Sequence, residues 1–391
     1  MKEFTAYMPT KVLFGAGVLN ELKNQTLPGD KALILLSDGT SAIKNGYYDR
    51  VKSLLEEAGV RTETFKGIEA NPLKDTVMKA AAFAQDKGCD FVVMLGGGSV
   101  MDAGKAVAAM ATNEGDLWDY VNGGTGKGKP LAKAPLPTVA VTTTAGTGSE
   151  VDAWGVVSNP ETNEKIGFGG DDRLFPTLSI VDPELMLTVP PAYTAYQGFD
   201  ALFHSTEVYI GNFSNEFSDM VAEKAIESVA KYLPVAVKDG KNLEARSKVA
   251  LGNTLSGYAM VYGCTTSEHS IEHAMSAYHH NLPHGAGLIM ISLAFYEHFI
   301  KKGACPERFV KMAKLMGKED AEKAEDFLKA LKKLQYDCGV ADLKMSDYGI
   351  KKEELEKIAV NARETMGGLF ASDPLPLTDA DVVEILKNSY K

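Results

Sequence analysis

Cysteine is scarce in this chain, with four residues in 391, and none of the four lies in a CxxC pair. Because the four are widely spaced, we expect neither a disulfide framework nor a cysteine zinc site. Long apolar runs are also absent: the N-terminal residues contain no signal-like stretch, and no window reaches the length of a membrane span. The sequence therefore predicts a reduced, cytoplasmic protein without a membrane partner.

Positive charge is in deficit, since 41 lysines and arginines face 52 aspartates and glutamates, for a net charge of -11. A phosphate backbone needs a basic surface, so we expect no nucleic-acid partner. The hydrophobic fraction of 45% is ordinary for a globular protein. A length of 391 residues exceeds one compact core and predicts about two domains.

The first half alternates short apolar runs with amphipathic stretches. Strands are predicted at residues 31–36, 60–66, 91–95 and 138–143, and helices at residues 47–58, 73–87 and 100–111. Such alternation is typical of parallel βαβ units with helices on both faces of a sheet. The glycine-rich residues 123–129 are read as a solvated surface loop, although their two lysines could attract phosphate.

The pattern changes after Val189-Pro190-Pro191. Strand-like runs end there, and helical patterns follow, for example at residues 219–232, 242–262 and 321–333. We therefore place a domain boundary near residues 183–192.

A glycine loop, Gly96-Gly97-Gly98-Ser99, directly follows the run at residues 91–95 and opens a helix. Glycines let a ligand approach the backbone, and a helix N-terminus favours phosphate. The alternative is a tight strand–helix turn. Neither the phosphate-loop pattern GxxxxGK[ST] nor GxGxxG is present. A second loop, residues 142–150, would lie at the same carboxyl edge, where parallel sheets bind ligands.

Histidines are clustered: five of the seven fall between residues 269 and 284, and His204 lies four residues after Asp200. Residues four apart share a helix face, as do His269 and His273. A lone histidine is usually structural, but this density together with a carboxylate predicts a metal such as zinc or iron(II). Beside a dinucleotide-type loop, a Lewis-acidic metal points to hydride transfer.

These motifs together resemble the iron-containing alcohol dehydrogenase family over nearly the whole chain. The matching segments are Phe14-Gly15-Ala16-Gly17, Asn71-Pro72, GGGSVMDAGK (96–105), TTTAGTGSEV (142–151), Val189-Pro190-Pro191, GFDALFHSTE (198–207) and residues 269–287. The resemblance implies an α/β plus all-α fold of the dehydroquinate synthase-like superfamily. It implies a Rossmann-like dinucleotide-binding domain at residues 1–187 and an all-helical metal-binding domain at residues 188–391.

The resemblance also implies roles for individual residues. The metal ligands would be Asp200, His204, His269 and His284, with His273 near the nicotinamide and substrate as a proton-handling or orienting group. Cofactor contacts would come from Asp38, Asn71, Gly97, Gly98, Ser99, Asp102, Thr143, Thr144, Thr147 and Lys165. Trp154 and Met260 would face either substrate or ordinary core. One departure is an extra residue between His273 and His284, and His279 and His280 beside it are read as exposed loop.

The expected activity is transfer of a hydride between NAD and a small primary alcohol or aldehyde, with Fe²⁺ as the metal. NADP and Zn²⁺ are the alternatives, and Asp38 favours NAD because a carboxylate there repels a 2′-phosphate. A lyase of the same fold acting on a phosphorylated polyol would need basic residues, and residues 269–287 contain no lysine or arginine. A non-catalytic binding protein is the third reading. We also expect a homo-oligomer, in the form of a dimer.

Overall fold

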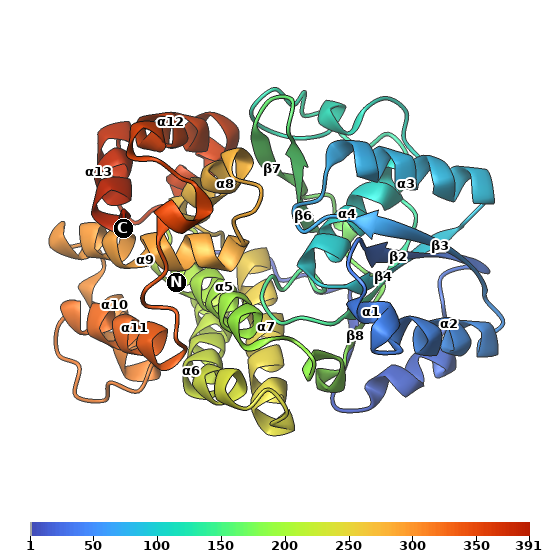
Figure 1. Cartoon of the computed structure of the whole chain (residues 1–391), viewed down its shortest axis with the longest axis horizontal. Helices are drawn as coiled ribbons and strands as arrows, with labels where there is room; N and C mark the ends of the chain where they lie inside the picture. Colours follow the sequence, from blue (N-terminus) through green and yellow to red (C-terminus); the bar gives the residue numbers. More distant parts are fainter. Residues whose placement is uncertain (1) are drawn as a thin grey trace.

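A six-stranded parallel sheet forms the centre of the first part of the computed structural model, which describes residues 2–391 (Figure 1). The strand order is β1-β8-β5-β4-β2-β3. The strands are β1 (Lys11–Phe14), β2 (Lys31–Ser37), β3 (Arg61–Ile68), β4 (Phe91–Gly96), β5 (Thr138–Thr142) and β8 (Leu178–Val181). A separate antiparallel hairpin consists of β6 (Trp154–Asn159) and β7 (Glu164–Gly169).

Helices cover both faces of the sheet because successive strand residues point to opposite sides. Leu35 of β2 belongs to the same core cluster as Val77 of α3 (Lys74–Lys87) and Val107 of α4 (Gly98–Met110). The preceding residue, Ile34, packs in a different cluster with Val51 of α2 (Tyr47–Glu57). The remaining helical segments of this part are η1 (Val18–Asn24), α1 (Ser41–Lys44), η2 (Leu117–Asp119), η3 (Asp172–Leu174) and η4 (Pro183–Met186).

The strands and helices predicted in the first half are confirmed, with ends that differ by one or two residues. Four strands, β1, β6, β7 and β8, were not predicted. Strands β1 and β8 have only four residues each, too few to show a period, and β1 is half-exposed at the sheet edge. The hairpin strands carry glycines and charged residues, which weaken the alternation expected of a strand.

The second part is helical, and within the described residues every strand lies before it. Its α-helices are α5 (Pro191–Ile210), α6 (Glu216–Lys238), α7 (Leu243–Tyr262), α8 (Ser267–Tyr278), α9 (His284–Lys301), α10 (Pro306–Leu315), α11 (Glu325–Asp337), α12 (Leu355–Met366) and α13 (Asp379–Ser389), with short 3-10 segments η5 (Met345–Tyr348), η6 (Lys352–Glu354) and η7 (Gly367–Ser372). Strand β8 ends at Val181 and α5 begins at Pro191, so the division that we propose between residues 187 and 188 lies between them.

One helix boundary was predicted wrongly. The pattern at residues 321–333 predicts a helix, but α11 begins at Glu325. The Asp326 carboxylate accepts hydrogen bonds from the backbone N–H groups of Glu322 and Lys323, at 3.1 and 3.3 Å. These bonds hold the preceding residues in a turn and delay the helix by one turn.

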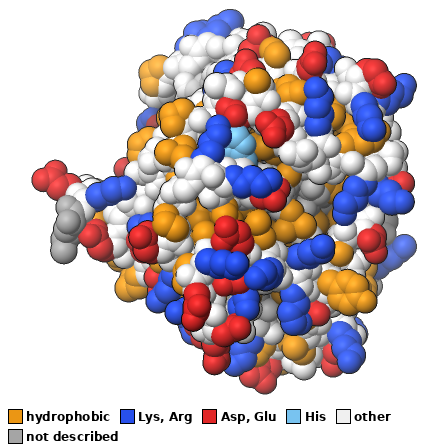
Figure 2. All heavy atoms as spheres, turned by 90° about the vertical axis from the view of Figure 1, so that its left-hand side faces the viewer, with side chains coloured by type: hydrophobic (Ala, Val, Ile, Leu, Met, Phe, Trp, Pro, Cys, Tyr) orange, Lys and Arg blue, Asp and Glu red, His pale blue; other side chains and the backbone are white. Residues whose placement is uncertain are grey.

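The surface of the helical part carries charges of both signs. Figure 2 shows lysine and arginine side chains interspersed with acidic ones on this face, with apolar side chains in a band across its middle. In residues 2–391, no helix has the length and apolar character needed to cross a membrane. Residues 123–129 form the predicted surface loop, and its Lys127 and Lys129 are paired with Asp119 at 2.6 and 3.3 Å.

Candidate active site

Three helices bring the four predicted metal ligands together. These are Asp200 and His204 on α5, His269 on α8, and His284 as the first residue of α9. Asp200 and His204 lie on one face of α5 because they are one turn apart. The start of α8 is held by two buried carboxylates: Glu207 accepts from the Thr266 N–H at 2.7 Å, and Asp373 accepts from the Ser267 N–H at 3.0 Å.

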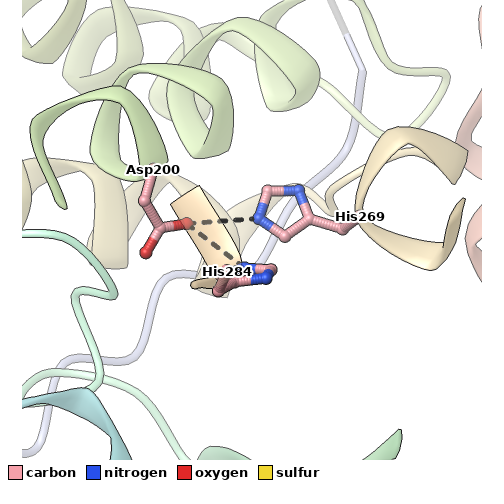
Figure 3. A group of neighbouring side chains, drawn as sticks. All are labelled: Asp200, His269 and His284. Carbon is pink, nitrogen blue, oxygen red and sulfur yellow. Dashed lines mark ion pairs between the residues drawn. The ribbon is translucent and has the colours of Figure 1, made fainter. Parts of the chain in front are cut away.

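The side chains converge on a single oxygen atom. Asp200 Oδ1 lies 3.6 Å from His204 Nε2, 3.5 Å from His269 Nε2 and 3.4 Å from His284 Nε2. Figure 3 shows Asp200, His269 and His284 pointing toward one another from separate helices. The ligand atoms of these three residues all lie within 4.8 Å of one another, and His204 stands just outside that group. Within residues 2–391, Asp200 Oδ1 and His269 Nε2 are buried without a hydrogen-bond partner, which fits metal ligands.

The other ring nitrogen, Nδ1, of each of the three histidine ligands already has a hydrogen-bond partner. Each Nδ1 atom has an oxygen acceptor: Glu207 for His269, Glu272 for His284, and the Gly146 carbonyl for His204, the last at 3.3 Å. Carboxylate and carbonyl oxygens only accept, so each neutral ring carries its proton on Nδ1 and its lone pair on Nε2. As long as all three rings are neutral, their lone pairs face one carboxylate oxygen and repel it, unless a cation lies between them.

The charges at the site also favour a cation. Burial raises the pKa of Asp200, but His204 and His284 outweigh burial and hold that pKa well below its usual value. Burial lowers the pKa of His204 to about 3. Burial likewise opposes the charged form of His269, yet Glu207 and Asp200 raise its pKa to about 10. The carboxylates thus draw positive charge into the cluster, and a divalent ion would satisfy them with all rings neutral.

Glu207 and Glu272 were not predicted as site residues. Both are fully buried, and each holds the Nδ1 atom of one histidine. A helical spacing could have revealed them: Glu207 lies two turns after Asp200 on α5, and Glu272 lies three residues after His269 on α8. The carboxylate–histidine–metal arrangement is a common outer layer of metal sites.

His273 lies beside the cluster rather than in it. Its ring centroid is 6.2 Å from that of His269 and 5.2 Å from that of His284. Its Nδ1 atom lies 2.7 Å from the Met366 sulfur. Burial, followed by the positive charges of Lys165 and His284, lowers the pKa of His273 well below its usual range. The ring is therefore neutral at neutral pH.

The two predicted ligand-binding loops meet at the carboxyl edge of the sheet. Helix α4 begins at Gly98, two residues earlier than predicted, and its first N–H groups have no partner within the helix. A Cβ atom on Gly97 would lie 2.9 Å from Thr144 Cγ2, and one on Gly98 would lie 2.2 Å from Thr147 Cγ2. Glycine is needed here because the loops touch, in addition to any approach by a ligand.

Two further predicted residues hold this edge together. Ser99 Oγ donates to the Ala70 carbonyl. The Asp102 carboxylate accepts from Ser149 Oγ at 2.7 Å and from the Val156 N–H at 2.9 Å. Burial raises the pKa of Asp102 to about 6. In the protein alone, both oxygens of Asp102 therefore brace the second loop against the hairpin.

Three more of the predicted cofactor-binding residues lie at or near this edge, each in a different setting. The Thr143 N–H donates to the Gly96 carbonyl at 2.9 Å and joins the ends of β4 and β5. Asn71 Nδ2 donates to the His280 carbonyl at 3.3 Å, which connects the two parts of the molecule. Asp38 directly follows β2 and is exposed at the same edge.

Lys165 lies beside the histidine cluster. It is nearly buried on β7, and its Nζ atom lies 3.2 Å from Glu272 Oε2 and 3.5 Å from His284 Nδ1. The sequence around the histidines contains no lysine, but the fold brings one from the other part of the chain. Glu272 neutralises that charge.

The sequence left Trp154 and Met260 open between a substrate-facing and a core position, and it assigned His279 and His280 to an exposed loop. Trp154 is 49% exposed at the start of β6 and is therefore not core. Met260 is half-buried on α7 and packs against the helical core. His280 is exposed, but the reading of His279 as exposed loop was wrong: its Nε2 atom lies 3.3 Å from Glu354, and the ring is largely covered.

The second loop connects the sheet edge with the histidine cluster. The Gly146 carbonyl faces His204, and the Gly148 N–H donates to Asn253 Oδ1 of α7 at 2.8 Å. A ligand bound at the carboxyl edge would thus lie beside the cation site. Fold and site together favour a two-part enzyme in which a nucleotide binds at the sheet edge beside a metal ion.

Comparison with known proteins identifies the family. Residues 9–183 match the model of the iron-containing alcohol dehydrogenases, and residues 194–390 match the C-terminal model of the Fe-containing alcohol dehydrogenase family. The chain belongs to the iron-containing alcohol dehydrogenase family, as its motifs predicted. It is an NAD(H)-dependent alcohol dehydrogenase with the predicted α/β plus helical fold.

Several relatives are similar over their whole length. A probable NADH-dependent butanol dehydrogenase 1 of Bacillus subtilis is 34% identical, with all of both chains covered. The 1,3-propanediol dehydrogenase of Klebsiella pneumoniae is also 34% identical, with 99% of both chains covered. Among solved structures, the NADH-dependent butanol dehydrogenase A of Thermotoga maritima has a TM-score of 0.89 and 31% identity, with 100% and 99% of the two chains covered.

Proposed function

We propose that this enzyme interconverts small primary alcohols, including diols, with their aldehydes at one divalent iron ion. The proposed ligands are Asp200, His204, His269 and His284. The observation that carries the proposal is the convergence of three Nε2 atoms on the unpartnered Asp200 Oδ1. Zinc suits the same ligands and generally binds more tightly than iron(II), so purified protein can carry zinc instead.

In this proposal the metal, when bound, supplies a Lewis acid for the alcohol or carbonyl oxygen. The two loops orient the nicotinamide so that hydride passes directly to or from the substrate carbon. The proposed cofactor contacts are Asp38, Asn71, Gly97, Gly98, Ser99, Asp102, Thr143, Thr144, Thr147 and Lys165. His273, which is neutral and adjoins the cluster, would orient the reactants and pass the alcohol proton outward, and Trp154 and Met260 are proposed to face the substrate.

The proposed substrate class is supported by relatives that are named for butanol and 1,3-propanediol. The pairing of Lys165 with Glu272 also leaves no free cation from that lysine for a phosphorylated or carboxylated substrate. The test is NADH consumption with butanal and 3-hydroxypropanal, in competition with phosphorylated and carboxylated aldehydes. A preference for the charged compounds would refute the proposed substrate class.

Replacing Asp38 with glycine is expected to raise kcat/KM for NADPH at least tenfold. The exposed carboxylate lies at the sheet edge where we propose that the adenosine ribose binds, and removing its repulsion of a 2′-phosphate is worth roughly 1–2 kcal/mol even when screened. Steady-state kinetics with both cofactors measures the effect. The matched control is Asp30→Gly, which removes an exposed carboxylate just before the opposite end of the same strand. A higher kcat/KM for NADPH than for NADH in the unmodified enzyme would contradict this role of Asp38.

Replacing Gly98 with alanine is expected to weaken NADH binding about tenfold or more. The new methyl group would overlap Thr147 Cγ2, and overpacking of this kind costs roughly 1–3 kcal/mol. The two loops would have to separate, which displaces their N–H and hydroxyl donors. Fluorescence titration with NADH provides the dissociation constant. Gly368→Ala is the control, since a Cβ there meets nothing within 4 Å; equal affinities in the two variants would argue against the loop contact.

We also propose that the enzyme works in the cytoplasm as a homodimer. A reducing compartment is supported by the four cysteines, all of which are free thiols. A dimer is supported by exposed apolar side chains, including Phe4, Tyr7 and Met8, in the residues that precede the edge strand β1. Light scattering coupled to size-exclusion chromatography tests the dimer, and a monomeric mass at micromolar concentration would refute it.

A further inference from the structure

Glu272 occupies an unusual position between the two parts of the molecule. It is fully buried on α8, where Ser276 Oγ donates to its Oε1 atom. Its Oε2 atom contacts His284 Nδ1 and lies 3.2 Å from the ammonium of Lys165, which comes from the β6–β7 hairpin. One carboxylate therefore connects a proposed metal ligand with the nucleotide-binding part of the chain.

The contacts determine where the proton of His284 lies. Both Glu272 and Lys165 are near His284 Nδ1, but lysine only donates and the carboxylate only accepts. The carboxylate contact is the closer one, so Nδ1 carries the proton and donates it to Glu272. Lys165 then donates to Glu272 rather than to the ring. The lone pair of His284 is left on Nε2, 3.4 Å from Asp200 Oδ1.

A second metal ion is the rival explanation for this cluster. Ligand atoms of Glu272, His273 and His284 also lie within 4.8 Å of one another. However, the Lys165 ammonium already lies beside Glu272 Oε2 and His284 Nδ1, and it supplies the positive charge that a second ion would bring. These residues are therefore better explained as the outer layer of one metal site than as a site of their own.

We propose that Glu272 is a positioning residue, which holds His284 with Nε2 directed at the metal while Lys165 balances the carboxylate charge. The hydrogen bond fixes the tautomer and the ring orientation, and it makes Nε2 a better donor to the ion. The Lys165 ammonium, 3.2 Å from Glu272 Oε2, pairs with Glu272 as a carboxylate, which is the acceptor that the Nδ1 proton of His284 requires. This inference rests on the ligand set proposed above.

The experiment measures Zn²⁺ affinity by chelator competition on protein free of nicotinamide, so that activity and cofactor contacts do not enter. Glu272→Gln is expected to weaken Zn²⁺ binding about 10–100-fold, because it replaces the carboxylate with a neutral, weaker acceptor and leaves Lys165 without its counter-charge. Glu164→Gln is the control, because Glu164 is a buried carboxylate next to Lys165 on the hairpin and accepts hydrogen bonds from Trp118, Thr125 and Thr162 instead of from a histidine. Its Zn²⁺ affinity should equal that of the unmodified enzyme.

A second comparison separates positioning from charge and packing. The comparison uses two double variants, Lys165→Met/Glu272→Gln and Lys165→Met/Glu272→Met. They have the same net charge and similar side-chain volumes, but only glutamine can accept a hydrogen bond from the Nδ1–H group of His284. The glutamine variant is expected to bind Zn²⁺ about 3–10-fold more tightly, the equivalent of one hydrogen bond. Equal affinities of the two, or unmodified affinity in Glu272→Gln, would overturn the proposal. The proposed metal ligands are tested by a separate variant: normal Zn²⁺ binding by His269→Ala would contradict that assignment.

Discussion

His269→Ala is expected to abolish bound metal and to lower kcat/KM by about three orders of magnitude or more. His269 lies at the centre of the cluster, with Nε2 on Asp200 and Nδ1 on Glu207, and its loss leaves two buried carboxylates without this partner. A Lewis-acidic metal contributes several kcal/mol to transition-state stabilisation, and each 1.4 kcal/mol is roughly tenfold in rate. Elemental analysis and NADH kinetics on the same preparation measure both quantities.

The control for this variant is His298→Ala. His298 lies on α9, the helix that begins with His284, but its ring faces Asp381 at 3.7 Å and not the metal site. Metal content and kcat/KM should therefore remain within a few fold of the unmodified enzyme. Circular dichroism establishes that both variants are folded. A folded His269→Ala protein with full metal content would contradict the assignment of His269.

Lys105→Met is expected to lower the free energy of unfolding by about 3–5 kcal/mol, because it removes one partner of a buried ion pair. Lys105 is fully buried on α4 and donates to Ser149 Oγ at 2.8 Å, Asp152 Oδ1 at 2.6 Å and the Trp154 carbonyl at 2.6 Å. All three of its donors are thus used, and Asp152 would be stranded without them. The midpoint of the first urea transition measures the loss.

The double variant Lys105→Met/Asp152→Asn tests the cause of that loss. Replacing both partners of a buried pair is often nearly neutral, so the double variant should regain part of the stability. Asparagine keeps an oxygen that can accept from the Trp154 N–H, which Asp152 now does at 2.8 Å. If the double variant is no more stable than Lys105→Met, a stranded Asp152 charge is not the reason for the loss.

Lys105 also illustrates how a motif can mislead. It follows a glycine eight residues after the glycine loop begins, which is close to the phosphate-loop pattern but does not match it. In the structure this lysine points into the protein and holds the segment between the second loop and the hairpin. The spacing of the glycines excluded a phosphate-loop role for Lys105, but it could not reveal the buried ion pair that Lys105 forms.

Much of this enzyme was determined by local sequence. The alternation of apolar runs with amphipathic stretches predicted four of the six parallel strands. Three of these, β2, β4 and β5, are buried on both faces, whereas β3 at the sheet edge is mostly half-buried. The interval between Asp200 and His204 sets both on one helix face, whatever the remainder of the chain does. Gly97 and Gly98 were recognised because a strand followed by glycines and a helix is a local pattern.

Only the tertiary structure decided which distant groups complete the site. His269 and His284 reach Asp200 because α8 and α9 pack against α5, and Lys165 reaches Glu272 across the two parts of the chain. The chain has 52 acidic residues, and their spacing does not show which ones are buried beside a histidine. Burial and the choice of partner depend on contacts between segments far apart in sequence, and those contacts exist only once the helices pack.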